Sequence, residues 1–503
     1  MSAGAKFLGV ILLLAAFLRA ATIHYGTNVD EGVYWSEGRL IYQGYFFYRD
    51  VHLNKPPLVS LVAAAFFPLG PTPIYPMRAV MLIFSMLGLY ACYLAARELL
   101  GEKAARAALL ILAFEPFSAV WAKYLHTSTW SPWFEAGVVW LLVTGLRSNR
   151  PRRVFFSSLV LGLYALNKQS AIFMIPTGIA AWLLFSPEKS ARRFVLDGFW
   201  WLFGILPIWI PFLLTVWLGG AFPAFLYDIW TAHHRLASFF ADHTPAFRLN
   251  EWRSIIALAP LLWLLPLGSL AGFAGKRWKE ILILWIWFLV TLWGNVFFIS
   301  HLWRHYLLVC MPPAAMLAGA VWTWFMDRLE TQAARGRILV PISWIPSGGW
   351  VILGLFMLIG WPKNDWTYPG LTLTEERNLA RHVERYCPEP FLLNLTNPAL
   401  YVWTGKEVPP CFQDGRMTRI PYFMTLAGRG YMDQDDIVQT VEYWKTLPIG
   451  CAVIYDRFAR QIWNEPSMEP LRIWLEHAFQ PPRRIGMGDS YYGWFLLFER
   501  KRD

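Results

Sequence analysis

One short segment of the chain holds the residue types that a group-transfer site needs. Asp30 and Glu31 directly follow the first apolar segment, and Lys55 lies further along, in front of two prolines. A carboxylate can take the proton of an attacking hydroxyl group, and an ammonium group can hold a phosphate. Beside a membrane, this combination predicts chemistry on a phosphate that is tethered in the lipid.

Asp30 and Lys55 each have a purely structural interpretation as well. An aspartate at the start of a helix caps free N–H groups and favours the helix dipole. A lysine at the membrane surface can anchor the chain by laying its stem along the lipid. A carboxylate at the bilayer edge is costly unless it is hydrated, paired or functional, which favours a chemical role for Asp30. Pro56 and Pro57 hold the backbone of Lys55 extended on a stiff platform.

Other groups offer further anion or metal ligands. Arg304 and His305 stand at the start of an apolar segment, Arg235 lies in a polar loop, and each is a candidate phosphate ligand. The segment 123–131 (KYLHTSTWS) has no carboxylate and offers only His126 as a metal ligand. One histidine is a weak basis for a metal site, so we favour chemistry without a metal. A divalent metal stays open as the alternative, and no other cofactor is indicated.

The composition is that of a polytopic membrane protein. Of the 503 residues 56% are hydrophobic and only 16% are charged, far from the norm for soluble proteins. Basic residues cluster in short loops at alternate ends of apolar segments, so the net charge of +11 reflects topology and not nucleic-acid binding. The first apolar segment is interpreted as an uncleaved span, because no small-residue cleavage site follows it and Arg19 interrupts its end.

Hydropathy and loop charge together predict about eleven spanning helices. They lie near residues 7–24, 77–97, 107–122, 131–146, 154–168, 171–186, 195–219, 253–273, 281–299, 306–326 and 338–360. This count puts residues 1–360 in a membrane domain and residues 361–503 on the outer face.

Four segments are predicted to face outward: 25–76, 123–131, 220–252 and the tail. In the first, the stretch from Asp30 to Gly44 predicts an amphipathic helix on the membrane, with Val33, Leu40 and Ile41 toward lipid. The apolar run 58–69 is too short to span and is expected at the interface. The tail is charged and alternates helical and strand-like segments, which predicts a small α/β domain.

The tail also holds three of the five cysteines, Cys387, Cys411 and Cys451. One disulfide is expected in an oxidising compartment. Pairing of Cys387 with Cys411 closes the shorter loop, but the third cysteine leaves the choice open.

These residues, in this order, resemble the GT-C superfamily of membrane glycosyltransferases. The closer resemblance is to the bacterial branch with the lipid A aminoarabinose transferases and relatives of the protein O-mannosyltransferases (dolichyl-phosphate-mannose-protein mannosyltransferases). The specific element is the first outer loop, which has the acidic pair Asp30-Glu31, then GYFFYRD, then KPPL from Lys55. The segments LGLYALNKQSAIFMIP and RHYLLVCMPPAAMLAG match later patterns of the family. The resemblance covers the membrane part, whereas the tail matches only in character.

The resemblance implies a GT-C fold and a sugar donor linked to polyprenyl phosphate, which is undecaprenyl phosphate in a bacterium. Asp30 would deprotonate an acceptor hydroxyl group in one inverting displacement, and Glu31 would orient Asp30 or the acceptor. Lys55 would be the first ligand of the phosphate, followed by Arg304, His305 or Arg235. The site would face the periplasm from the inner membrane and serve lipid A or lipopolysaccharide, another cell-envelope glycan, or a protein acceptor.

One departure from the family pattern bears on the mechanism. Many members carry an acidic residue in the second outer loop, whereas here no carboxylate follows before Glu135, inside a predicted span. The departure disfavours a metal site built from two carboxylates. Asp30 is therefore expected to act directly as the base and not as a metal ligand.

Three other classes of protein remain compatible with the sequence. A transporter, channel or flippase explains the many spans but not the acidic first loop or the tail. A lipid-linked polymerase or oligosaccharide ligase works at the same membrane face. The third class is a degenerate homologue that has lost its catalytic activity and is retained as a binding subunit.

Overall fold

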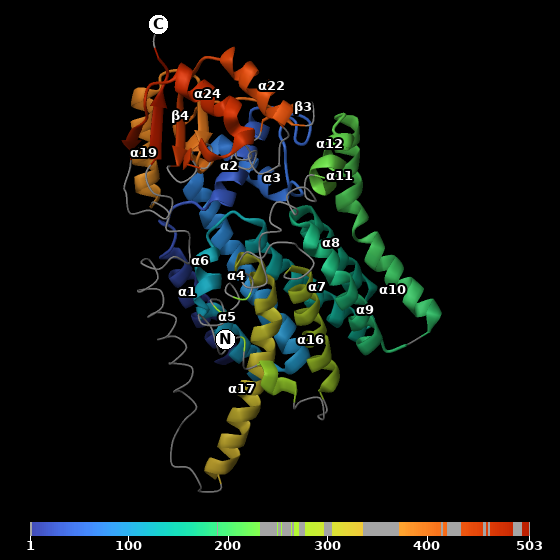
Figure 1. The fold of residues 1–503 in the computed structure, drawn as a ribbon. Coiled ribbons are helices and arrows are strands. Elements are labelled where there is room, and N and C mark those ends of the chain that lie inside the picture. Colours follow the sequence, from blue (N-terminus) through green and yellow to red (C-terminus); the bar gives the residue numbers. More distant parts are fainter. Residues whose placement is uncertain are drawn as a thin grey trace.

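The fold was taken from a computed structural model that describes most of the chain. The described residues are 3–188, 190–231, 266–270, 277–295, 304–334, 372–413, 416–419, 434–455, 459–460, 463–485 and 495–501, with Leu249, Arg253 and Trp263. Apolar helices form one body, and a smaller unit of strands and helices packs on one end of it, over α2 (Figure 1).

The helical body is built from the long apolar runs of the sequence. Its elements are α1 (Ala3–Ala20), α2 (Val29–Tyr42), α3 (Leu58–Phe66), η1 (Phe67–Leu69), α4 (Ile74–Leu100), α5 (Glu102–Phe114), α6 (Pro116–Trp121), α7 (Thr127–Arg147), α8 (Pro151–Asn167), η2 (Gln169–Phe173), α9 (Met174–Phe185), α10 (Ala191–Phe203), α11 (Leu206–Leu218), α12 (Phe222–Leu226), η3 (Tyr227–Thr231), α16 (Trp278–Trp293), η7 (Arg304–Cys310) and α17 (Met311–Ala334). The helices α4, α5, α7 and α8 pack side by side at its centre.

Among the described residues, two helices are long and apolar enough to cross a membrane, Ile74–Leu100 and His305–Arg328. The pair α10 and α11 counts as a third if the two helices, which bend by 44° at their break, form one span. Most of the other predicted spans coincide with shorter apolar helices. The predicted spans 253–273 and 338–360 lie largely or wholly outside the described residues, so the total of about eleven stays a prediction.

The predicted span 107–122 is broken at Glu115. Its carboxylate accepts hydrogen bonds from the N–H groups of Phe117 and Ser118 and so caps α6, whose first residue is a proline. The carbonyl groups at the end of α5 are thereby left without helical partners. Arg19, fully buried, donates to the carbonyl oxygen of Ala113 at 2.6 Å. Arg19, which interrupts the first predicted span, therefore caps the C-terminal end of α5.

Helix α2 carries the acidic pair, and its cap differs from the expected one. Asn28, not Asp30, is the N-cap: its side chain accepts from the N–H of Glu31 at 2.7 Å. Val33 and Leu40 are buried, so they do not face lipid as the periodicity predicted. The reason is that α3 and the tail helix α20 (Ala399–Thr404) pack on α2 from different sides.

Two glycines let these neighbours approach the backbone of α2. A Cβ atom on Gly32 would lie 2.7 Å from the N of Ala399, and one on Gly38 would lie 2.4 Å from the Cβ of Ala63 in α3. Both distances are shorter than packed atoms allow. The position of α2 between the helical body and the tail is therefore fixed at backbone level.

The tail folds around a four-stranded sheet in the order β1-β4-β6-β5. β1 and β4 pair in parallel, whereas β6 runs antiparallel to β4 and β5. The remaining strands, β2 and β3, form an antiparallel pair. The elements are α19 (Leu373–Tyr386), β1 (Phe391–Leu395), α20, β2 (Cys411–Gln413), β3 (Arg416–Thr418), α22 (Gln434–Lys445), β4 (Ile449–Tyr455), η10 (Pro466–Met468), α24 (Glu469–Ala478), β5 (Arg483–Ile485) and β6 (Phe495–Glu499).

Side chains of the sheet alternate between two apolar clusters, as the period of a strand requires. Ala452 and Ile454 of β4 join the cluster that contains Trp444 of α22 and Trp474 of α24. Val453 between them joins the large cluster that also holds α19, α20 and the helical body. One face of the sheet is thus covered by α22 and α24, and the other is continuous with the rest of the molecule.

A disulfide bond joins Cys387, at the end of α19, to Cys451 in β4. Of the pairings that the sequence left open, this one closes the longer loop. Cys411 is buried and takes no part in this disulfide bond, and its Sγ lies 3.6 Å from the carbonyl oxygen of Thr418.

Polar contacts tie the tail to the first outer loop. Glu376 of α19 accepts hydrogen bonds from the N–H and hydroxyl groups of Thr27, just before α2. Arg39 of α2 donates to the carbonyl oxygen of Tyr401 in α20 and to those of Gly405 and Lys406 just after this helix. Both ends of α2 therefore depend on the tail.

Candidate functional site

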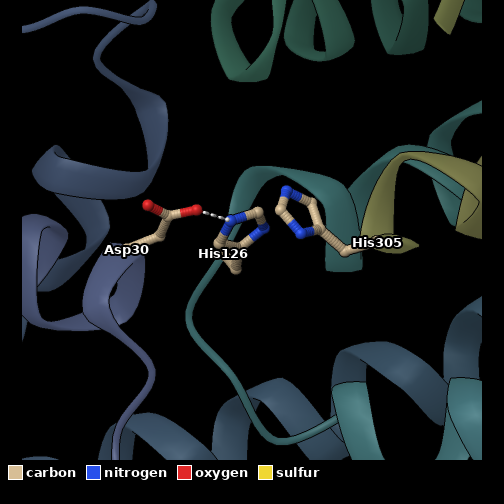
Figure 2. A group of neighbouring side chains, drawn as sticks. All are labelled: Asp30, His126 and His305. Atoms are coloured by element: carbon tan, nitrogen blue, oxygen red, sulfur yellow. Dashed lines mark hydrogen bonds and ion pairs between the residues drawn. The ribbon is translucent and has the colours of Figure 1, made fainter. Parts of the chain in front are cut away.

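Asp30 and His126 form the centre of the candidate site. Asp30 stands in the first turn of α2, and His126 is the N-cap of α7. Asp30 Oδ2 and His126 Nε2 lie 2.9 Å apart, as Figure 2 shows. The side chain of His126 is fully buried, whereas 41% of the Asp30 side chain is exposed. The carboxylate is thus held from one side and open on the other.

The hydrogen bonds of His126 determine where its proton lies. Its Nδ1 accepts from the N–H of Ser128 at 2.9 Å, which is the cap of α7. A neutral imidazole that accepts at Nδ1 carries its proton on Nε2. Burial lowers the pKa of His126 to about 4 against the effect of Asp30, so the ring is neutral at pH 7. It therefore donates to Asp30 from Nε2.

Asp30 is correspondingly ionised. Burial opposes its charge, but the hydrogen bond from His126 and the positive charge of Lys55 outweigh burial and hold the pKa of Asp30 well below its usual range. An anionic carboxylate with one open side is what a general base requires, although a strongly lowered pKa weakens its pull on a proton.

His305, in η7, lies against the same pair. Its ring centroid is 4.7 Å from that of His126 and 4.8 Å from that of Trp121. Within the described part of the chain, its Nε2 is buried and has no hydrogen-bond partner. Figure 2 shows the ring of His305 next to that of His126 at the centre of the site. Among the described residues, this nitrogen is therefore a buried polar atom next to His126 whose hydrogen-bonding capacity is unused.

Asp30, His126 and His305 offer ligand atoms within 4.8 Å of one another, a grouping that suits a metal ion. The hydrogen bonds do not fit such an ion as they stand. Because Nδ1 of His126 accepts from Ser128, its Nε2 carries a proton and has no lone pair for a metal. For Nε2 of His126 to bind a metal ion, the proton would have to move to Nδ1, and the hydrogen bond from Ser128 that caps α7 would be lost.

Lys55 is presented by a loop that is held at three places. Its carbonyl oxygen accepts from the hydroxyl group of Tyr48 at 3.1 Å, and the carbonyl of Asn54 lies 3.4 Å from Gln169 Nε2. The N–H of Leu53 donates to Asp228 at 3.3 Å. Burial lowers the pKa of Lys55, and the charge of Asp30 opposes this change. Asp30 and Lys55, predicted to act together, are thus near enough to interact electrostatically.

Lys168, which we did not predict as a site residue, is a second lysine at this place. It follows the end of α8, is buried, and donates to Ser128 Oγ at 3.1 Å, beside His126. Its Nζ lies 4.3 Å from the centre of the Tyr306 ring, and it interacts electrostatically with Lys55 and Asp30. Two sequence signals were present: Lys168 ends a predicted span, which usually marks a snorkelling side chain, and it lies in the segment LGLYALNKQSAIFMIP that matches a family pattern.

Glu37 is the other group that sequence reasoning missed. It stands two helical turns after Asp30 on the same face of α2, and it is 1% exposed. Its Oε2 accepts from Ser60 Oγ at 2.5 Å, and burial raises its pKa to about 8 against the effects of Ser60 and Lys55. Glu37 is therefore protonated at pH 7.

Glu31 points away from this group. Its two oxygens are 2.7 Å and 3.2 Å from nitrogens of Arg78 in α4, and Oε1 also accepts from the N–H of Leu125 at 3.3 Å. The ion pair is fully buried. Arg78 also donates to the carbonyl oxygens of Ile23, Tyr25 and Gly26. The second acid of the pair thus belongs to a structural cluster that fixes the entry to α2.

The two remaining candidates are not placed beside Asp30 by the structure. Arg304 begins η7, next to His305, but its side chain is not among the described groups. Arg235 lies outside the described residues.

The sequence matches the family model of dolichyl-phosphate-mannose-protein mannosyltransferase over residues 54–217. This stretch begins just before the KPPL motif and ends in α11. No curated protein matches the chain at a significant level.

The fold is similar to that of solved membrane glycosyltransferases. ArnT from Cupriavidus metallidurans in the apo state superposes with a TM-score of 0.64 at 14% identity, over 99% of this chain and 98% of ArnT. The same protein bound to undecaprenyl phosphate gives 0.61 at 14% identity, over 98% and 97% of the two chains. The oligosaccharyltransferase AglB from Archaeoglobus fulgidus, in complex with an inhibitory peptide and a dolichol-phosphate, gives 0.54 at 12% identity, over 100% of this chain and 75% of AglB.

The chain is therefore a multi-pass membrane protein with the fold of the GT-C glycosyltransferases. The resemblance to this superfamily that the first outer loop predicted is confirmed.

Proposed function

We propose that the protein transfers a sugar from a polyprenyl-phosphate carrier to a hydroxyl group of an acceptor at the outer face of a bacterial cytoplasmic membrane. The acceptor is a lipid A or other envelope glycan, or a protein. In this proposal residues 1–360 form the membrane domain, 361–503 form the periplasmic domain, and the sugar is transferred with inversion.

The observation that carries the proposal is the charge balance around Asp30. One ionised carboxylate lies near two lysines, Lys55 and Lys168, while His126 and Glu37 are neutral at pH 7. Burial lowers the pKa of both lysines, and an anion that joins them favours their charged forms. A phosphate next to an open carboxylate is the arrangement that transfer from a sugar phosphate needs.

The chemical step follows from these positions. Asp30 accepts the proton of the acceptor hydroxyl, and the oxygen forms a bond to the anomeric carbon of the sugar. The bond between that carbon and the phosphate oxygen breaks, and the polyprenyl phosphate leaves with the electron pair. Lys55 and Lys168 face the charge that develops on the leaving group. A single displacement inverts the anomeric centre.

His126 and Glu31 support Asp30 in different ways. The N–H of His126 keeps the carboxylate charged and fixes its direction, with the open lone pairs toward the acceptor. We assign Glu31 a positioning role, because Arg78 and the N–H of Leu125 occupy both of its oxygens.

The test is transfer by the purified protein in lipid nanodiscs, with a panel of undecaprenyl-phosphate sugars and a membrane extract as acceptor. Asp30→Asn should abolish transfer while still binding bare undecaprenyl phosphate, and Lys55→Met should weaken that binding. Asp327→Asn, at an exposed acid paired with Lys103 at 2.8 Å, is the control and should have full activity. Undiminished transfer by Asp30→Asn would show that Asp30 is not the base.

A further inference from the structure

A buried carboxylate in the third outer segment holds the loop that presents Lys55. Asp228, in the π-helical turn η3, has no exposed surface. Its Oδ2 accepts from the N–H of Leu53 at 3.3 Å, and its Oδ1 lies 3.0 Å from His52 Nδ1. Both contacts fall within three residues of Lys55. The position of the lysine therefore depends on this carboxylate.

The same loop contains a residue in an unfavourable backbone conformation. Tyr48 has a φ of 64°, in the left-handed region that side chains other than glycine rarely adopt. Its ring is fully buried and packs edge-on against Phe225 at 5.1 Å between centroids. Its hydroxyl group donates to the carbonyl oxygen of Lys55 at 3.1 Å. Such conformations persist where the surroundings enforce them, often at functional sites.

One residue of the tail contacts both of these groups. Arg416, the first residue of β3, donates from Nη2 to Asp228 Oδ1 at 2.9 Å. Its Nη1 is 3.4 Å from the carbonyl oxygen of Tyr48, and its guanidinium carbon lies 4.9 Å from the centre of the Tyr227 ring. One guanidinium group thus joins the tail, the third outer segment and the first outer loop.

We propose that Arg416 is a positioning residue for the donor site, which sets Lys55 through Asp228 and Tyr48. The three residues Arg416, Asp228 and Tyr48 are called the bracket below. The proposal rests on the proposed function, in which Lys55 holds the donor phosphate. It makes the tail a part of the donor site.

The backbone beside the bracket supports this role. The N–H of Arg419 donates to the carbonyl oxygen of Asp50 at 2.9 Å, and the hydroxyl group of Thr418 lies 3.3 Å from the same oxygen. The tail therefore holds residues 48–51, and Asp228 holds the next two residues. Without Arg416, the buried carboxylate of Asp228 would lose an ion pair and keep, among the described residues, the N–H of Leu53 and the ring of His52. Tyr48 would lose a contact that holds its strained backbone.

The experiment compares Arg416→Gln and Arg416→Lys with the wild-type protein in nanodiscs. Two quantities are measured: the Kd for bare undecaprenyl phosphate, and amide hydrogen exchange in residues 46–57. We expect Arg416→Gln to raise the Kd about tenfold and to accelerate exchange in this loop. Arg416→Lys keeps a positive charge near Asp228, but an ammonium group cannot bind Asp228 and the carbonyl oxygen of Tyr48 at once as a guanidinium group does. Its Kd and exchange rate should therefore lie between those of the wild-type protein and Arg416→Gln.

Arg500→Gln is the matched control. Arg500 is an equally half-buried tail arginine, and it donates to the carbonyl oxygens of Leu447 and Ile449 within the tail. Its replacement should change neither the Kd nor exchange in residues 46–57. A second variant, Asp228→Asn, keeps the shape of the bracket and should reproduce the effect of Arg416→Gln.

The outcomes separate this proposal from the proposed function. If Lys55→Met leaves the Kd unchanged, the role of Lys55 fails, and the exchange data still decide whether Arg416 holds the loop. If Lys55→Met raises the Kd but Arg416→Gln and Asp228→Asn change neither quantity, the bracket is overturned. Faster exchange without weaker binding overturns it too, because the loop would then move without consequence for Lys55.

Discussion

His126 connects Asp30 to the backbone of α7: its Nε2 lies 2.9 Å from Asp30 Oδ2, and its Nδ1 accepts from the N–H of Ser128. The two ring nitrogens therefore have separate duties, one to the carboxylate and one to the helix. Because the duties fall on different atoms, substitution can separate them.

Two amide substitutions at His126 should have opposite effects. In His126→Asn the short amide oxygen can still cap α7, but nothing reaches Asp30. We expect near-normal stability and sugar transfer that is slower by roughly 10- to 100-fold, because a hydrogen bond to a charged group is lost. Without this hydrogen bond the pKa of Asp30 rises, so the fall of the transfer rate on the acid side of the pH profile should begin at a higher pH. In His126→Gln the longer amide reaches Asp30 but loses the cap, which costs about 1 kcal/mol. Transfer rates from pH 4 to 8 and thermal unfolding check both variants. Equal losses of transfer would contradict the division of duties.

Glu31→Gln should act on stability and not on the chemical step. It leaves Arg78 buried without its anion, a change that typically costs about 3–5 kcal/mol. A second substitution, Arg78→Met, should recover part of this loss, since no unpaired charge then remains. Unfolding in detergent and the kcat of the surviving folded protein are the measurements. A stable Glu31→Gln protein with a greatly reduced kcat would restore the catalytic role expected from the sequence.

Lys168→Met should weaken binding of the lipid phosphate. The substitution removes one of the two lysines near Asp30, so we expect the Kd for undecaprenyl phosphate to rise about tenfold. Lys123→Met is the control, since Lys123 is also a buried lysine that donates to a single oxygen, the carbonyl of Val120 at 2.8 Å. It belongs to the Arg78 cluster and not to the site. An equal effect of both substitutions would mean that the loss is structural.

Glu37 should make the stability fall as the pH rises. The unfolded chain ionises this carboxyl group near its ordinary pKa, whereas the folded protein keeps it protonated up to about pH 8. Between these values the native state binds more protons, so stability drops by at most about 1.4 kcal/mol per pH unit. Glu37→Gln removes this contribution and should flatten the profile between about pH 5 and 8.

Unfolding at several pH values measures the effect of Glu37. Ser60→Ala removes the hydrogen-bond partner of Glu37 but leaves the titrating group, so its profile should still slope. A wild-type profile that is parallel to that of Glu37→Gln would show that Glu37 is ionised in the folded protein.

The local parts of the site could be predicted from the sequence, and the distant parts could not. Asp30 and Lys55 stand in one loop with recognisable spacing, and the structure brings them together. The partner of Asp30 lies 96 positions away, and nothing in KYLHTSTWS shows which way the histidine turns. Glu31 was expected to orient Asp30 or the acceptor because the two acids are adjacent, yet one step along a helix points side chains about 100° apart.

The fold, too, could be predicted from the sequence only in part. Apolar runs located the helices, because burial in lipid requires them. The periodicity of α2 predicted a lipid-facing side, but it cannot distinguish lipid from the apolar surfaces of α3 and α20. Lys168 and Glu37 were overlooked since a single charged residue near an apolar segment has many ordinary explanations.

The disulfide bond between Cys387 and Cys451 imposes an order on the maturation of the protein. The second cysteine comes 64 residues after the first, so the bond can close only after α20, β2, β3 and α22, which lie between the two cysteines, have been made. It fastens α19, the helix whose Glu376 holds Thr27 at the entrance to α2. Newly made protein in a cell that lacks its disulfide-forming machinery should therefore reach the membrane with its spans inserted but with α2 poorly seated.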